Sequence, residues 1–102
     1  MKIAIALATA DMEVQIDVRG ARAAYYLIVD TDNGHSEIAA NPAAQAERSA
    51  GPTAAGFLID RGVNKVIAGD FGPRFRAELK TAGVNCELST GTAAAVIKEL
   101  DV

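Results

Sequence analysis

Helix-like and strand-like segments alternate through the second half of the chain, and this alternation limits the possible folds more than any other feature. Two helical patterns begin at a Gly-Pro pair and end at a glycine, at residues 51–62 and 72–83. Proline is favoured in the first turn of a helix, where its missing N–H is not needed, and glycine just after the last turn. A strand-length run of residues follows each helix, at 65–68 and 84–88. Strands that alternate with helices predict parallel pairing through right-handed crossovers.

The first half of the chain predicts an antiparallel part of the same sheet. Residues 2–8 are rich in isoleucine and alanine, and Tyr25–Asp30 combines aromatic and β-branched residues, which is typical of strands. Asp32-Asn33-Gly34 separates the second run from the short run Ser36–Ala40, and an Asn-Gly pair supplies the positive φ angles of a tight hairpin. We therefore expect an α/β fold, with a mixed five-stranded sheet and helices on both of its faces.

The length of the chain fits a single domain over residues 1–102. Half of the residues are hydrophobic, but alanine supplies 21 of them, so the larger apolar side chains suffice for one modest core. The longest apolar run, residues 23–29, is far shorter than the roughly 20 residues that cross a bilayer. Lys2, the apolar residues 3–7 and Ala8-Thr9-Ala10 resemble a signal peptide. This apolar segment is shorter than the usual minimum of about seven residues, so we expect a buried first strand.

The charge of the chain argues against nucleic acid as a partner. Ten basic and 13 acidic residues give a net charge of −3, and neither half of the chain is the basic surface that binds phosphate backbones. The single cysteine, Cys86, has no partner for an internal disulfide and supplies too few thiolates for a metal site. A reducing, cytoplasmic location fits best, and the lack of an exposed apolar stripe favours a monomer.

Three junctions between a strand and a helix have features of an anion site. Each contains a glycine at the start of a helix, at residues 48–52, 68–74 and 89–92, with Thr90 or Thr92 as the cap of the last helix. Free N–H groups and the positive end of the helix dipole point outward at a helix start. Ligands of open α/β sheets gather at the carboxyl ends of the strands. Any small α/β domain needs such turns, so each junction alone is a weak indication.

The segment Arg19-Gly20-Ala21-Arg22 is a more specific candidate. It places two arginines around a glycine in the long connection between the first two strands. Guanidinium groups bind anions as planar forks, and glycine allows a close approach of the backbone. The alternative, equally well supported, is that the two arginines are solvated or pair with Asp17 and Asp11 at the surface.

The other reactive side chains have a simpler structural interpretation. We expect His35, alone in the hairpin turn, to be exposed rather than to bind a metal. We expect Cys86 to be a small buried hydrophobe rather than a nucleophile. Asp11 and Asp70 follow neighbouring strands, which leaves a metal-dependent phosphodiesterase as an alternative. A two-metal site normally needs more acidic ligands than these two.

Several short motifs lie in a fixed order along nearly the whole chain: Met1-Lys2-Ile3-Ala4-Ile5, Arg22-Ala23-Ala24-Tyr25-Tyr26-Leu27-Ile28-Val29-Asp30, Asn41-Pro42-Ala43-Ala44, Gly62-Val63, Gly69-Asp70-Phe71-Gly72-Pro73, Ala82-Gly83-Val84 and Thr90-Gly91-Thr92. Their order and spacing resemble the small iron–molybdenum cofactor biosynthesis proteins. These proteins have a NifX-type domain, which also occurs as a C-terminal module of larger assembly proteins.

This resemblance implies a three-layer, ribonuclease H-like fold without nuclease activity. It also implies binding or carrying of a sulfur-bridged metal cluster, typically iron–molybdenum and in some relatives molybdenum–copper. Many members have His-Phe-Gly-Arg where this chain has Arg19-Gly20-Ala21-Arg22, and the histidine is a candidate ligand of the cluster. Arginine does not ligate metals, so the resemblance does not carry a direct metal bond to this position.

We therefore expect a non-enzymatic protein that binds, carries or stores an anionic iron–molybdenum–sulfur cluster or a related molybdenum cluster. Arginines and backbone N–H groups would hold the cluster without a metal ligand from the protein. The expected cluster-binding residues are Arg19, Gly20, Ala21, Arg22, Gly51, Gly72, Arg74, Thr90 and Gly91. Cluster-assembly proteins are the expected partners, and nucleic acid and membranes are not. The alternative is an interaction module of a metallocluster assembly pathway that binds no cluster of its own.

Overall fold

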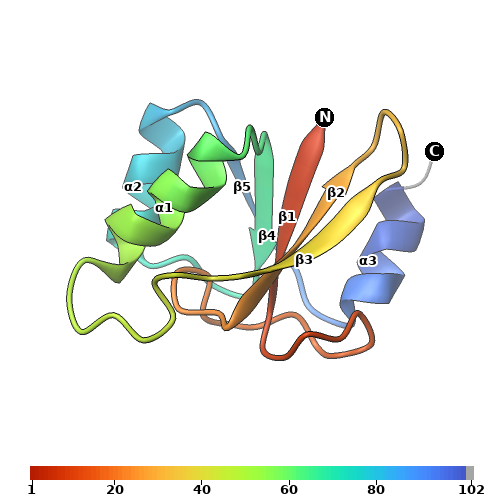
Figure 1. Cartoon of the computed structure of the whole chain (residues 1–102), viewed down its shortest axis with the longest axis horizontal. Helices are drawn as coiled ribbons and strands as arrows, with labels where there is room; N and C mark the ends of the chain where they lie inside the picture. The colour runs from red at the N-terminus through yellow and green to blue at the C-terminus, as the bar shows by residue number, and fades with distance from the viewer. Residues whose placement is uncertain (101–102) are drawn as a thin grey trace.

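A mixed sheet forms the centre of the molecule. The computed structural model describes residues 1–100 (Figure 1). Its strands are β1 (Lys2–Leu7), β2 (Tyr25–Asp30), β3 (Ser36–Ala40), β4 (Lys65–Ala68) and β5 (Asn85–Leu88), and its helices are α1 (Ala50–Asp60), α2 (Pro73–Thr81) and α3 (Ala93–Leu100). The strand order is β3-β2-β1-β4-β5. The pairs β1–β2 and β2–β3 are antiparallel, and β1–β4 and β4–β5 are parallel. The predicted mixed five-stranded α/β sheet is confirmed.

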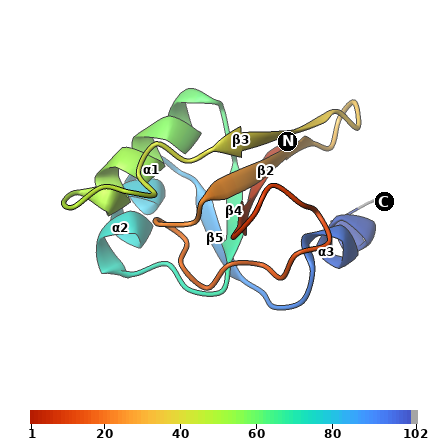
Figure 2. The same cartoon turned by 60° about the horizontal axis from the view of Figure 1, so that its bottom comes forward.

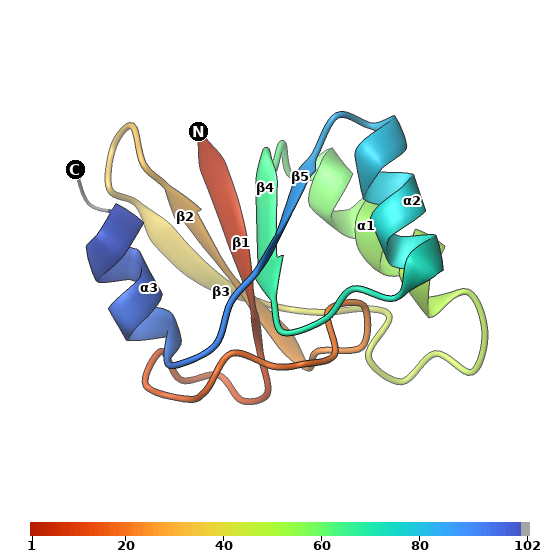
Figure 3. The same cartoon turned by 180° about the vertical axis from the view of Figure 1, so that it is seen from behind.

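The helices lie on both faces of the sheet, with α1 and α2 on one face and α3 on the other (Figures 1 and 3). Alternate side chains of a strand point to opposite faces, and β1 shows this division. Ala4 and Ala6 belong to the core beneath α1 and α2, whereas Ile3, Ile5 and Leu7 belong to the core beneath α3. Burial on both faces explains why β1 is apolar almost throughout. The interpretation of this segment as a buried strand is confirmed.

The helices are short, with 11, 9 and 8 residues. None of those in residues 1–100 is long and apolar enough to cross a membrane. The two Gly-Pro pairs lie at the starts of α1 and α2, as predicted. Of the two threonines expected to cap α3, Thr92 does so, since its Oγ1 accepts the N–H of Ala95 at 3.2 Å.

The turn between β2 and β3 is longer than the tight Asn-Gly hairpin predicted. It is closed by the N–H of Asp30, which donates to the carbonyl of His35 at 2.8 Å. Gly34 has a φ of 72°, but Asn33 does not adopt a positive φ. The side-chain oxygen of Asn33 instead accepts the N–H of His35 at 2.8 Å. The predicted hairpin is confirmed, but the positive φ angle expected at Asn33 is not, because this side-chain bond stabilises a longer loop.

All three helices begin at one edge of the sheet. β1, β4 and β5 are parallel, and β3 runs in the same direction because two antiparallel steps separate it from β1. The carboxyl ends of these four strands therefore lie together. From this edge the chain enters α1, α2, α3 and the long connection 8–24 (Figure 2). Ligand sites of open α/β sheets occur at such an edge.

Candidate functional site

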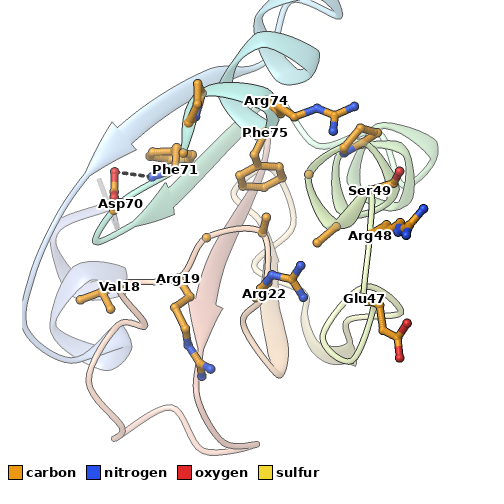
Figure 4. Close-up of a pocket in the computed structure, with 17 residues that line it drawn as sticks. Val18, Arg19, Arg22, Glu47, Arg48, Ser49, Asp70, Phe71, Arg74 and Phe75 are labelled. Carbon is orange, nitrogen blue, oxygen red and sulfur yellow. Dashed lines mark hydrogen bonds between the residues drawn. The ribbon is translucent and has the colours of Figure 1, made fainter.

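A pocket of about 800 Å³ lies at this edge, beside the starts of α1 and α2. Three segments line it, at residues 18–22, 47–52 and 70–75 (Figure 4). The first belongs to the connection after β1, the second leads into α1, and the third joins β4 to α2. A volume of this size lies within the range of small-molecule and cofactor sites.

Backbone hydrogen bonds hold two of these segments against each other. The N–H of Gly69 donates to the carbonyl of Asp17, and the N–H of Gly20 donates to the carbonyl of Asp70, both at 3.0 Å. A Cβ atom at Gly20 would lie 2.7 Å from the Asp70 carbonyl oxygen and 3.0 Å from the ring of Phe75. The close approach of the two segments therefore requires a glycine at position 20.

We expect Gly20→Ala to destabilise the fold by about 1–3 kcal/mol, because its methyl group overlaps backbone as well as a side chain. Gly56→Ala is the matched control, since a Cβ atom at this position in α1 meets open space. That substitution should stabilise the protein by about 0.5–1 kcal/mol, because alanine favours helices over glycine. Urea unfolding followed by circular dichroism measures both. Equal changes in the free energy of unfolding of the two variants would show that stability does not depend on the close approach of Gly20 to Asp70 and Phe75.

Two helix starts contribute to the pocket. Gly72 precedes α2 with φ 72° and ψ 154°, a conformation that essentially only glycine adopts. Ser49 precedes α1 in the left-handed region, with φ 58°. Gly72 has no side chain that could cap α2, and within residues 1–100 the hydroxyl of Ser49 does not cap α1. The N–H groups in the first turns of both helices are therefore left without a side-chain cap from these positions, and with the helix dipoles they favour an anion.

Arginine dominates the charge of the pocket. Its four cationic residues are all arginines, at Arg19, Arg22, Arg48 and Arg74, and its carboxylates are Glu47 and Asp70. The pocket therefore carries an excess of positive charge in a chain whose net charge is −3. The aromatic rings of Phe71 and Phe75 stack with centroids 5.8 Å apart beside these charges. We call this site the arginine pocket.

The four guanidinium groups differ in their surroundings. The guanidinium of Arg22 points towards the segment that carries Arg48 (Figure 4), and it donates to the carbonyl of Ala46. The guanidinium of Arg19 points away from Phe75 (Figure 4). It donates instead to both carboxylate oxygens of Asp17, with Nε–Oδ1 and Nη2–Oδ2 distances of 3.2 and 3.0 Å. Of the two sequence-based interpretations of Arg19, its pairing with Asp17 is confirmed.

The ion pair between Arg19 and Asp17 has an exposed and a buried partner. The side chain of Arg19 is 60% exposed, whereas that of Asp17 is 5% exposed. Burial raises the pKa of the Asp17 carboxyl, but hydrogen bonds from Arg19 and its charge outweigh burial and hold the pKa below its ordinary value. The same pair raises the pKa of Arg19. Asp17 is therefore ionised at neutral pH and holds Arg19 at the rim of the pocket.

This lowered pKa of Asp17 predicts a pH dependence of stability. A carboxyl with a depressed pKa in the folded state stabilises the protein above its unfolded pKa, and the contribution is lost as the pH falls through the folded pKa. Asp17→Asn should therefore lower the free energy of unfolding at pH 7 and lower it less at pH 3. Urea unfolding of both proteins at the two pH values measures this difference. If Asp17→Asn lowered the free energy of unfolding equally at both pH values, the lowered pKa of Asp17 would be contradicted.

The structure places seven of the nine expected cluster-binding residues in the arginine pocket: Arg19, Gly20, Ala21, Arg22, Gly51, Gly72 and Arg74. Thr90 and Gly91 do not line it. The carbonyl of Gly91 accepts the N–H of Ile16 at 2.8 Å, so this junction packs against the connection after β1. Sequence reasoning did not assign Arg48 to the site, although it lies in a junction that the glycine pattern had identified.

The two aspartates considered for a phosphodiesterase site do not lie together in the pocket. Asp70 lines the pocket, whereas Asp11 does not. The carboxylate of Asp11 accepts the N–H of Glu13. Among the described residues, no three histidine, cysteine, aspartate or glutamate side chains gather as a metal site. Cys86 is half-buried, and burial raises the pKa of its thiol, which Arg76 and Lys80 only partly offset. His35 is exposed in the turn, as expected.

Comparisons with known proteins agree with this architecture. The model of a family described as "Dinitrogenase iron-molybdenum cofactor" matches residues 1–101. The NMR structure of a candidate NifB protein from Thermotoga is similar, with a TM-score of 0.82 and 32% identity over 97% of this chain and 85% of that one. The apo form of the orange protein from Desulfovibrio gigas has a TM-score of 0.87 at 24% identity, with the same coverage, and shows the shared fold. No curated protein sequence matches the chain.

Proposed function

The chain belongs to the dinitrogenase iron-molybdenum cofactor family, and we propose that it binds and carries an anionic metal–sulfur cluster in the arginine pocket. The excess of positive charge in this pocket is the observation that carries the proposal. Four arginines and two helix starts line this pocket, in a chain whose net charge is −3. Guanidinium groups and backbone N–H groups are hydrogen-bond donors that suit an anion rather than a cation.

The donor set favours an intact cluster over a bare metal ion. The lining residues include neither histidine nor cysteine, the residues that bind soft transition metals most readily. Glu47 and Asp70 are the only carboxylates among them, and these alone are a poor metal site. In the proposed complex the cluster arrives with its own sulfur ligands, and the protein supplies hydrogen bonds and charge.

The family and the fold support the remaining parts of the proposal. We propose a non-enzymatic carrier of an iron–molybdenum or related molybdenum cluster, in the cytoplasm, that exchanges its cargo with cluster-assembly proteins. The strand order β3-β2-β1-β4-β5 and the helices on both faces support the ribonuclease H-like designation. Thr90 and Gly91 stay in the proposal as outer positions at the same edge of the sheet.

Titration of ¹⁵N-labelled protein with tetrathiomolybdate, followed by NMR, tests the location of the site. We expect the amide signals of residues 19–22, 50–51 and 72–75, apart from the proline, to shift most. Molybdate, which has oxygen in place of sulfur and the same charge, is the comparison. Its shifts show how much of the binding comes from the charge of the anion alone. Shifts restricted to β3 or to the far end of the sheet, or no shifts, would contradict the proposed site.

A further inference from the structure

A buried polar network lies beneath the segment 20–23, of which residues 20–22 line the arginine pocket. Tyr26 on β2 is fully buried, and its hydroxyl donates to the carbonyl of Gly20 at 2.6 Å. Asn41 is also buried, and its side-chain nitrogen donates to the carbonyls of Ala21 and Ala23, both at 2.8 Å. Three carbonyl groups from four successive residues are therefore directed at interior donors.

Both donors are fixed in place. The side-chain oxygen of Asn41 accepts the N–H of Ala43 at 3.0 Å, which leaves its nitrogen facing the segment 20–23. The same nitrogen lies 3.3 Å from the hydroxyl oxygen of Tyr26 and links the two side chains. Burial, with a smaller contribution from the charge of Asp17, raises the pKa of Tyr26, so its hydroxyl keeps the proton that it donates. The network is thus preorganised in the free protein.

The same segment leaves two backbone donors without a partner. Among residues 1–100, the N–H groups of Ala21 and Arg22 donate to no protein acceptor, and both residues line the pocket. Carbonyl oxygens carry partial negative charge and N–H groups partial positive charge. The direction in which the carbonyls of this segment point therefore determines whether an anion meets repulsion or attraction there.

We propose that Tyr26 and Asn41 are positioning residues that set the polarity of the arginine pocket. They hold the carbonyls of residues 20, 21 and 23 towards the interior, so that an anion meets N–H and guanidinium groups instead. This inference rests on the proposed anion-binding function. Without the Tyr26 hydroxyl, the Gly20 carbonyl is a buried acceptor that lacks a donor, and it regains one by turning towards solvent in the pocket. That turn brings a negative dipole into the anion site.

Tyr26→Phe tests the inference, and Tyr25→Phe is the matched control. Tyr25 is the adjacent residue on β2 and packs against the core on the opposite face of the sheet. Both variants lose one hydroxyl and no charge. We expect tetrathiomolybdate, added anaerobically and followed by its visible absorbance, to bind Tyr26→Phe about tenfold more weakly than wild type. Tyr25→Phe should bind within about twofold of wild type.

A merely structural role of Tyr26 would lower stability without changing the backbone donors. The second readout is therefore the NMR shift of the Ala21 and Arg22 amides on addition of tetrathiomolybdate, which should shrink in Tyr26→Phe and persist in Tyr25→Phe. If Tyr26→Phe does not fold, Asn41→Ser carries the same test, because its shorter side chain no longer reaches both carbonyls.

The outcomes separate the inference from the proposed function. Weak binding by Tyr26→Phe with loss of the two amide shifts supports the positioning role. Binding by Tyr26→Phe equal to that of wild type overturns the inference and leaves the proposed function standing. A wild-type protein that binds no tetrathiomolybdate overturns the proposed function, and the inference with it.

Discussion

Replacement of both Arg19 and Arg22 by alanine is expected to weaken the binding of a molybdenum–sulfur cluster about 100-fold while the fold is retained. Both guanidinium groups would form charge-assisted hydrogen bonds to the anion, and a loss of about 100-fold for the two together is a conservative expectation for such bonds. Neither side chain belongs to the hydrophobic cores, so the fold should be retained, and the loss of stability should come mainly from the buried Asp17, which loses its partner Arg19. Equilibrium titration with tetrathiomolybdate measures the loss, and urea unfolding confirms the fold.

The two arginines should contribute unequally. Asp17 already neutralises much of the charge of Arg19, whereas Arg22 donates only to a neutral carbonyl. Arg22→Ala should therefore weaken binding more than Arg19→Ala. Lys80→Ala combined with Lys98→Ala is the control, because it removes the same charge from the last turns of α2 and α3, and neither lysine lines the pocket. If this control weakened binding as much as the arginine pair, overall charge rather than the pocket would be responsible.

Phe75→Ala is expected to lower the free energy of unfolding by about 3–5 kcal/mol, the usual cost of removing a buried phenylalanine side chain. Phe75 is 1% exposed and stacks on Phe71. A domain of this size has a total stability of about 5–15 kcal/mol, so this one change removes a large part of it. Because Phe75 also lines the arginine pocket, any variant that remains folded should bind the cluster more weakly.

Phe57→Ala serves as the comparison for Phe75→Ala. Phe57 lies on α1, is only partly buried, and packs against the same core. Phe57→Ala should lower the free energy of unfolding less than Phe75→Ala does. It should leave cluster binding unchanged, since Phe57 does not line the pocket. Urea unfolding of the two variants shows which of them loses more free energy of unfolding. A smaller loss for Phe75→Ala than for Phe57→Ala would contradict the position of Phe75 at the junction of core and pocket.

Much of the fold could be predicted from the sequence because its signals are local. Gly-Pro pairs at helix starts and short apolar runs identify α1, α2 and the strands without knowledge of their neighbours. The same signals placed Gly51 and Gly72 among the candidate site residues. The hairpin was predicted correctly, but local reasoning missed the conformation of its turn, where the side chain of Asn33 stabilises a longer loop than the Asn-Gly pair indicates.

The interior of the site could not be predicted because it depends on contacts between distant residues. Asn41 donates to the carbonyl of Ala21 from 20 positions away, and no local pattern predicts this pair. Arg48 becomes a pocket residue only because β3 runs parallel to β1 and thus delivers the start of α1 to the same edge as α2. The third junction, with Thr90 and Gly91, has the same local pattern but packs elsewhere.

The metal and acid-labile sulfide content of the protein tests the central claim most directly. The protein would be purified anaerobically, offered a molybdenum–sulfur cluster, and passed through a desalting column. We expect molybdenum and sulfide to co-elute with the wild-type protein in a fixed ratio, and to separate from the variant that lacks Arg19 and Arg22. A folded wild-type protein that elutes without molybdenum and sulfide would contradict a carrier function of the arginine pocket.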